Sequence, residues 1–148
     1  MTLSAALTFA VRILAGALFV TAGALKIGHF NELAAAIAGF RILPQPVIGP
    51  LAVFLPFFEA GLGLYLIAGL FTRIAASLAA FQLLVYSAAI ASAVLRNIPA
   101  NCGCFGPQDS APADWPHALV DVALAGICAI LAWRAPGIFA LDNRMKGS

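Results

Sequence analysis

Four long apolar stretches run along the chain, and short polar stretches separate them. A helix needs roughly 20 residues to cross the roughly 30 Å of hydrocarbon in a bilayer. Stretches of that length cover about residues 6–25, 50–71, 74–95 and 116–133. The pattern predicts an all-α membrane protein, in which residues 1–148 form a single domain built as a bundle of four transmembrane helices.

The segment 27–43, between the first two stretches, is mixed in character. Polar residues interrupt apolar ones that recur at helical spacing: Leu33, Ala34, Ile37 and Phe40. Such a pattern is typical of a short amphipathic helix lying on the membrane surface. We expect Pro44 and Pro46 to end it, because proline cannot continue the hydrogen-bond ladder of a helix.

The tight link at Thr72-Arg73 makes the second and third spans an antiparallel hairpin. The third span carries small residues at four-residue steps, which let helix backbones approach closely in lipid: Ala75/Ala79, Ser87/Ala91 and Ala88/Ser92. A long polar loop, residues 97–115, separates this hairpin from the fourth span.

Composition supports the assignment to a membrane. The chain is 63% hydrophobic and 9% charged, with a mean hydropathy of +1.01, whereas a soluble domain carries about a quarter charged residues. The formal charge of +2 includes no basic run that would favour nucleic acid. Ala22-Gly23-Ala24 has the form of a signal-peptide cleavage site, but Leu3–Val11 is apolar where a charged leader belongs, so we interpret this stretch as the first transmembrane helix.

Four spans place both termini on the same side of the membrane. That side carries more basic residues near the spans, namely Arg73, Arg134, Arg144 and Lys146. Positive residues favour the cytoplasm, so we expect cytoplasmic termini in a bacterial inner membrane. The loop 97–115 then faces the periplasm, which is oxidising.

The polar loop contains two of the three cysteines, Cys102 and Cys104, on either side of Gly103. Glycine can take the positive φ needed to bend the backbone between them. A closed Cys-Gly-Cys ring is small and strained, and strained exposed disulfides are the more oxidising, labile ones. The pair therefore predicts redox chemistry, with Cys102 and Cys104 as catalytic residues.

Two other interpretations of the pair stay open, a structural turn and a copper(I) site, since soft thiolates suit that ion. Met1 and Met145 are the only methionines, which counts against copper handling, and we assign no metal ligands. Cys128 lies within the fourth span, where a thiol usually behaves as a small hydrophobe.

Glu59 lies near the middle of the second span, where an ionisable residue is costly and normally faces a partner or a cavity. Arg12 and Lys26 both come from the first span and could reach it, and Arg12 is the first choice. The pair would fix helix register, or Glu59 would serve as a proton-relay or quinone-site carboxylate, or it would be protonated and alone. Pro56 is expected to kink the helix just before it.

Asp121 and His117 form an i, i+4 pair near the loop end of the fourth span. Such a pair either anchors a helix start at the interface or serves the thiol chemistry, because imidazole exchanges protons near neutral pH. We name His117 and Arg96 as candidates for stabilising a thiolate. Glu59, Arg12, Lys26 and Asp121 are the candidate cofactor-binding residues, and quinone is the candidate cofactor.

Three motifs carry a resemblance to a known family: Gly23-x-x-Lys26, Leu55-Pro56-Phe57-Phe58-Glu59 and Cys102-Gly103-Cys104-Phe105-Gly106. Together they resemble the MauE branch of the DoxX-like four-helix membrane proteins. The resemblance implies a role in methylamine utilisation, supporting disulfide formation in a periplasmic dehydrogenase alongside a thioredoxin-like partner. DoxX relatives are linked with quinone-coupled thiol chemistry. The predicted arrangement, a cysteine motif at the outer mouth of a four-helix bundle, is also similar to that of vitamin K epoxide reductase and the bacterial disulfide-bond membrane oxidases. Their C-x-x-C motif is missing here.

The sequence thus favours a membrane thiol–disulfide oxidoreductase, whose cysteine loop exchanges disulfides with an extracytoplasmic thioredoxin-like or cysteine-containing partner. Cys102 is preferred as the attacked sulfur, because Cys104 is nearer the last helix and better placed to resolve. The alternatives are a non-enzymatic scaffold subunit of a larger membrane complex and a copper-handling protein.

Overall fold

The computed structural model describes residues 3–103, 106, 111–135 and 139–145. The helices in these ranges are α1 (Leu3–Lys26), α2 (Phe30–Gly39), α3 (Gln45–Ala68), α4 (Thr72–Leu95), α5 (Trp115–Arg134) and α6 (Leu141–Met145). Among them α1, α3, α4 and α5 are long and apolar enough to cross a membrane. The expected all-α protein with four spans is confirmed, and α2 is the short helix expected between the first two.

The start of α3 differs from the expectation. The helix begins at Gln45 rather than near Pro50, with Pro44 as its extended N-cap and Pro46 in its first turn. Proline is compatible with that turn, because the backbone N–H groups there have no partner within the helix. Pro46 therefore lies in the first turn of α3, and a short link that includes Pro44 connects α3 to α2.

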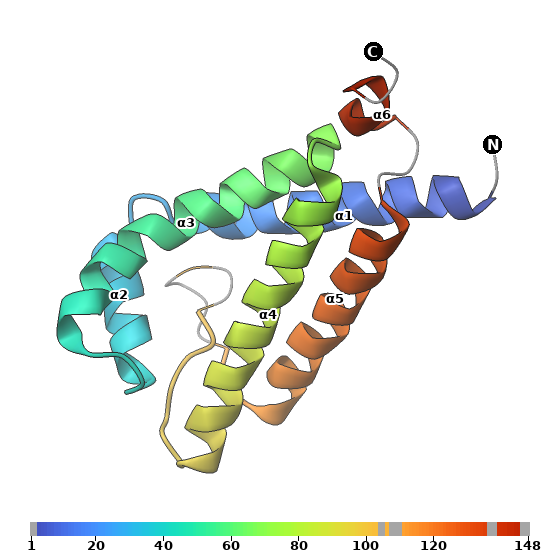
Figure 1. Ribbon diagram of the computed structural model, residues 1–148. Helices are drawn as coiled ribbons and strands as arrows, with labels where there is room; N and C mark the ends of the chain where they lie inside the picture. Colours follow the sequence, from blue (N-terminus) through green and yellow to red (C-terminus); the bar gives the residue numbers. More distant parts are fainter. Residues whose placement is uncertain (1–2, 104–105, 107–110, 136–138, 146–148) are drawn as a thin grey trace.

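Helices α1 and α3 run side by side (Figure 1) and approach each other through glycines. A Cβ atom on Gly16 would lie 2.8 Å from the carbonyl oxygen of Gly63, and one on Gly23 would lie 2.6 Å from that of Pro56. No side chain larger than hydrogen fits such gaps without a shift. The glycines therefore fix the register in which α1 lies against α3.

Helices α4 and α5 form the second close pair. Ala75 and Ala79 of α4 are buried in one core with Ala125 and Leu131 of α5, as the small-residue spacing predicted. The hydroxyl of Ser87 also donates a 2.9 Å hydrogen bond to the carbonyl of Ala118.

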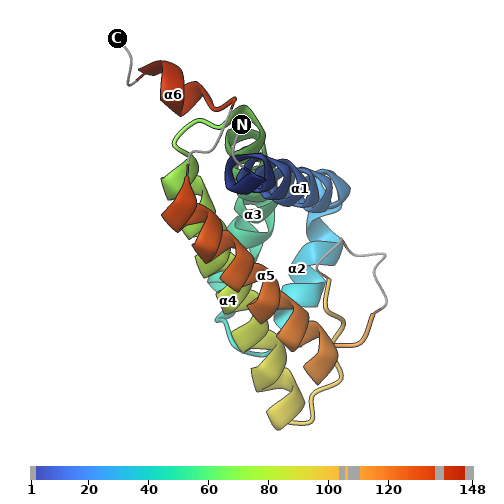
Figure 2. The same cartoon turned by 90° about the vertical axis from the view of Figure 1, so that its right-hand side faces the viewer.

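The two pairs meet at one end and diverge toward the other, as Figures 1 and 2 show from two directions. At the closed end lies α6, whose Asp142 carboxylate accepts hydrogen bonds of 2.7 and 2.9 Å from the backbone N–H groups of Phe71 and Thr72. This carboxylate caps the first turn of α4. At the open end, α2 and the segment after α4 lie between the two pairs.

We expect Gly23→Ala to destabilise the protein by about 1–3 kcal/mol, the usual cost of overpacking a close contact. The matched control is Gly126→Ala, because an added Cβ on Gly126 meets nothing within 4 Å. The control should change stability by about 1 kcal/mol or less. Equilibrium unfolding in mixed detergent micelles measures both, and equal effects would contradict the glycine-set register.

Candidate functional site

A buried ion pair joins α1 to α3. The ammonium of Lys26 lies 2.7 and 2.9 Å from the two carboxylate oxygens of Glu59, and both residues are 1% exposed. Helical side chains lean toward the N-terminus of their own helix. Because α1 and α3 are antiparallel, the two side chains lean toward each other. Glu59 thus has a partner, but it is Lys26 rather than the first choice, Arg12.

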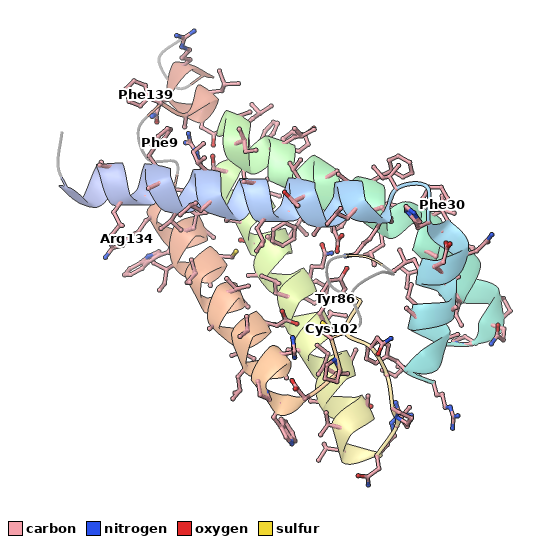
Figure 3. The ribbon with its side chains drawn as sticks, turned by 180° about the vertical axis from the view of Figure 1, so that it is seen from behind. Phe9, Phe30, Tyr86, Cys102, Arg134 and Phe139 are labelled. Atoms are coloured by element: carbon pink, nitrogen blue, oxygen red, sulfur yellow. The ribbon has the colours of Figure 1, made fainter. Side chains whose placement is uncertain are left out.

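Arg12 lies at the other end of the protein. Its guanidinium donates a 3.2 Å hydrogen bond to the carbonyl of Phe139 and lies 5.3 Å from the ring centroid of Phe9. Figure 3 shows Phe9 and Phe139 together at one end, remote from Tyr86 and Cys102. The structure therefore separates Arg12 from the other residues named as cofactor-binding candidates.

Two residues of α4 that the sequence analysis missed complete the cluster around Glu59. The amide nitrogen of Gln82 lies 2.7 Å from Glu59 Oε1 and 2.9 Å from the hydroxyl oxygen of Tyr86. The Tyr86 hydroxyl donates to the same carboxylate oxygen. Gln82 is an amide in the middle of an apolar span, a signal that could have drawn attention to it.

Asp121 of α5 is buried, and its Oδ2 atom has no hydrogen-bond partner among the described residues. The ring of His117 instead contacts Asp114, with 2.6 Å between Nδ1 and Oδ1. Asp114 also caps α5 by accepting a hydrogen bond from the backbone N–H of His117. These bonds from His117 lower the pKa of Asp114. His117, named as the i, i+4 neighbour of Asp121, thus has Asp114 as its hydrogen-bond partner.

Arg96, named as a candidate for stabilising a thiolate, uses its donors to connect α4 to the end of α2. Its Nη1 atom donates a 3.1 Å hydrogen bond to the carbonyl of Arg41, and Nη2 donates to that of Phe40. The side chain therefore holds α2 across the open end of the bundle.

The loop before α5 holds Cys102 in a defined position. The backbone N–H of Cys102 donates to the carbonyl of Ala111 at 2.9 Å, and Gly103 has a φ of +63°, the left-handed conformation expected for it. Cys102 is disulfide-bonded, whereas Cys104 lies outside the described residues. Cys128 is a free thiol buried in the core, in line with its interpretation as a small hydrophobe.

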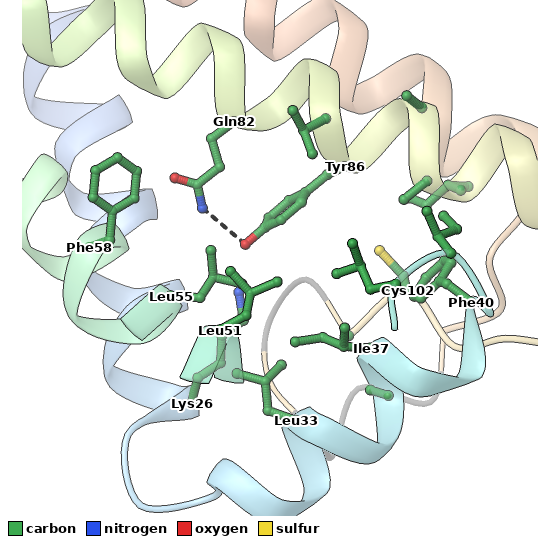
Figure 4. Close-up of a pocket in the computed structure, with 18 of the residues that line it drawn as sticks. Lys26, Leu33, Ile37, Phe40, Leu51, Leu55, Phe58, Gln82, Tyr86 and Cys102 are labelled. Atoms are coloured by element: carbon green, nitrogen blue, oxygen red, sulfur yellow. Dashed lines mark hydrogen bonds between the residues drawn. The ribbon is translucent and has the colours of Figure 1, made fainter. Parts of the chain in front are cut away.

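An apolar pocket of about 640 Å³ lies between α2, α3 and α4. Its lining includes Lys26, Gln82 and Tyr86 from the cluster around Glu59, and Cys102 from the loop before α5. Figure 4 shows Gln82 and Tyr86 reaching into the pocket from α4, while the Cys102 sulfur points into it from the other end. The structure thus brings a cysteine and a buried polar cluster to one cavity.

These features define a class of protein, a multi-pass membrane protein with a buried ion pair and a cysteine loop that lines an apolar pocket. Within the described residues, no group of three or more His, Cys, Asp and Glu residues is arranged to hold a metal.

A family model described as "Methylamine utilisation protein MauE" matches residues 4–134, and the chain belongs to this family. The MauE protein of Paracoccus denitrificans is 33% identical over 129 residues, covering 86% of this chain and 69% of that protein. The MauE protein of Methylophilus methylotrophus is 31% identical over 119 residues, covering 78% of this chain and 63% of that protein. No solved structure matches.

We expect Lys26→Met and Glu59→Gln each to destabilise the protein by about 3–5 kcal/mol, because each leaves a buried group without its partner. The double variant should lose clearly less than the sum of the two, because the residues interact directly. Equilibrium unfolding in mixed micelles measures this coupling, with exposed Arg134→Met as the control. Additive losses would show that the ion pair contributes nothing as a pair.

Proposed function

We propose that the chain carries out thiol–disulfide exchange at Cys102 and Cys104 with an extracytoplasmic thioredoxin-like or cysteine-containing protein. The observation that carries the proposal is the disulfide-bonded Cys102 at the wall of an apolar pocket. A disulfide in a short loop, next to a space that a second reactant could occupy, suits turnover better than a purely structural bond.

The exchange moves two electrons and two protons from the partner to this chain. A thiolate of the partner attacks one sulfur of the Cys102–Cys104 bond and forms a mixed disulfide, and the displaced sulfur leaves as a thiolate. The second partner thiol then attacks the mixed disulfide. The partner gains a disulfide bond, and this chain keeps two thiols with the two electrons and two protons.

The position of Cys102 bears on which sulfur the partner meets. Because its sulfur points into the pocket (Figure 4), we assign the partner's attack to Cys104 and the inward side of the reaction to Cys102. This assignment reverses the preference drawn from the sequence, in which Cys104 was placed as the resolving thiol.

Family membership supplies the biological setting of the proposal. Both relatives carry the name methylamine utilization protein. We propose that the exchange supports disulfide formation during maturation of a methylamine dehydrogenase, an enzyme of the periplasm.

Thiol alkylation of freshly isolated membranes tests the exchange. We expect Cys102 and Cys104 to react with a maleimide only after reduction, because they form a disulfide at rest. Cys102→Ser should leave Cys104 able to trap a mixed disulfide with the partner, and should lower methylamine dehydrogenase activity in the host by about tenfold or more. The matched control Cys128→Ser should keep that activity. Full activity in both Cys102→Ser and Cys104→Ser would favour a scaffold role instead.

The proposed orientation, with both termini in the cytoplasm and the cysteine loop in the periplasm, has its own test. After mild reduction of spheroplasts, a maleimide that cannot cross membranes should label the loop cysteines, because they face the outside. A Cys128→Ser background restricts labelling to that loop. Labelling that appears only after the membrane is broken would show that the loop cysteines face the cytoplasm, the opposite of the proposed orientation.

A further inference from the structure

The pocket between α2, α3 and α4 is open at the outer surface of the long helices, which lipid would cover in a membrane. Phe54 of α3 and Phe81 and Val85 of α4 line it and are also 59%, 66% and 48% exposed. They lie on the two helices whose pairs diverge (Figure 1). A molecule dissolved in the bilayer can therefore enter between these helices, and its apolar part would be surrounded by Leu, Ile and Phe side chains. The volume of about 640 Å³ is in the range of pockets that bind small molecules.

The inner end of the pocket is polar, and its hydrogen bonds are incomplete. Gln82 is 5% exposed, and its Oε1 atom has no hydrogen-bond donor among the described residues. A buried acceptor without a donor is costly. The ammonium of Lys26 carries three N–H donors, and the two oxygens of Glu59 are its contacts at 2.7 and 2.9 Å. Gln82 and Lys26 both line the pocket, so a ligand that reaches its inner end can meet one unpaired acceptor and one further donor there.

These two groups specify what the ligand must present. An oxygen that accepts a hydrogen bond would meet Lys26, and an O–H group would meet Gln82 Oε1. A phospholipid acyl chain presents neither. A quinone presents carbonyl oxygens when oxidised and O–H groups when reduced, on a ring that suits an apolar pocket entered from the membrane.

The cysteine pair needs such a ligand, because an exchange that leaves two thiols on this chain must be followed by their oxidation. Of the described residues, Cys128 is the free cysteine, and it is buried in the core formed with α4. The electron acceptor therefore has to come from outside the chain. Cys102 lines the same pocket as Gln82 and Lys26.

We propose that this pocket binds the ring of an isoprenoid quinone, which reoxidises the cysteine pair, an inference that rests on the proposed thiol–disulfide exchange. The two S–H bonds of Cys102 and Cys104 break, one S–S bond forms, and two O–H bonds form on the quinone. Two electrons and two protons pass from the thiols to the ring, which leaves as hydroquinone into the bilayer.

Gln82 and Lys26 have different roles in this site. The carbonyl oxygen of Gln82 accepts a hydrogen bond only from the reduced ring, because only hydroquinone has O–H groups to donate. The amide thereby binds the product more tightly than the substrate. Tighter binding of hydroquinone makes the bound quinone a stronger oxidant, which favours transfer from Cys102. Gln82 acts here as a binding residue, whereas Tyr86 and Glu59 position it through hydrogen bonds.

Equilibrium dialysis of the purified full chain in detergent micelles tests the site, with a ubiquinone carrying a single isoprene unit, in both redox states, as the probe. The protein as purified should bind about one molecule per chain and prefer the hydroquinone. Gln82→Met should weaken hydroquinone binding about tenfold, which corresponds to about 1.4 kcal/mol, and should change quinone binding by less than about threefold. Ser87→Ala, on the α5-facing side of α4, should change neither.

A second variant covers the case in which Gln82→Met does not fold. Ala89 lines the pocket, so Ala89→Phe should fill it and weaken both redox forms about tenfold or more. Unchanged binding in Ala89→Phe, or equal affinity of Gln82→Met and the unaltered protein for hydroquinone, would overturn the proposal. So would complete displacement of the probe by an equal concentration of phospholipid, which would identify an acyl chain as the occupant.

The variant Cys102→Ser separates this inference from the proposed function. It should bind the probe like the unaltered protein but should not reduce it, whereas the pre-reduced unaltered protein should remove the ultraviolet absorption of the quinone. Binding without reduction by that pre-reduced protein would overturn the role of the quinone as acceptor. If no mixed disulfide with the partner can be trapped but the probe still binds in a way that depends on Gln82, the exchange alone is refuted. Loss of probe binding with intact exchange would refute the pocket alone.

Discussion

The ion pair between Lys26 and Glu59 is the interaction on which the arrangement of the helices depends. Neither charge is stable by itself in the interior of a membrane protein, and each of them is 1% exposed. The antiparallel register of α1 and α3 must therefore bring them together, and the glycine contacts at Gly16 and Gly23 allow that register. Gln82 extends the cluster to α4 through the same carboxylate, so one acidic group relates three helices to one another.

The cluster also determines what the space beside it can bind. Helices α3 and α4 are connected through Glu59 and Gln82 but diverge beyond them, which leaves a pocket with apolar walls and a polar inner end. Gln82 contributes its nitrogen to the cluster, and its carbonyl oxygen has no donor among the described residues. The structural role and the proposed binding role thus belong to opposite sides of one amide group, which is why the variant Gln82→Met affects both.

Hydropathy predicted the four spans, since the bilayer imposes length and composition on any helix that crosses it. The start of α3 could not be placed in this way, because Pro46 is as compatible with a first turn as with a helix end. Glu59 was found because a carboxylate in an apolar span stands out. Its partner was assigned wrongly, because Arg12 and Lys26 lie on the same helix and only the glycine-set register decides between them. The position of Tyr86 in the cluster and the existence of the pocket depend on how far the helix pairs diverge. A single sequence gives no information about that divergence.

The two ends of the bundle are closed by different means, and this difference bears on where the proposed chemistry takes place. At one end Asp142 caps α4 and Arg12 binds the Phe139 carbonyl, so charged groups hold the helix pairs together. At the other end α2, Arg96 and the cysteine loop bridge a gap that the long helices leave open. A bundle closed by its own helices at both ends would leave no room beside Cys102. The divergence of the pairs, which leaves the pocket open at the outer surface of the long helices, is therefore the same feature that lets the loop with Cys102 reach that pocket.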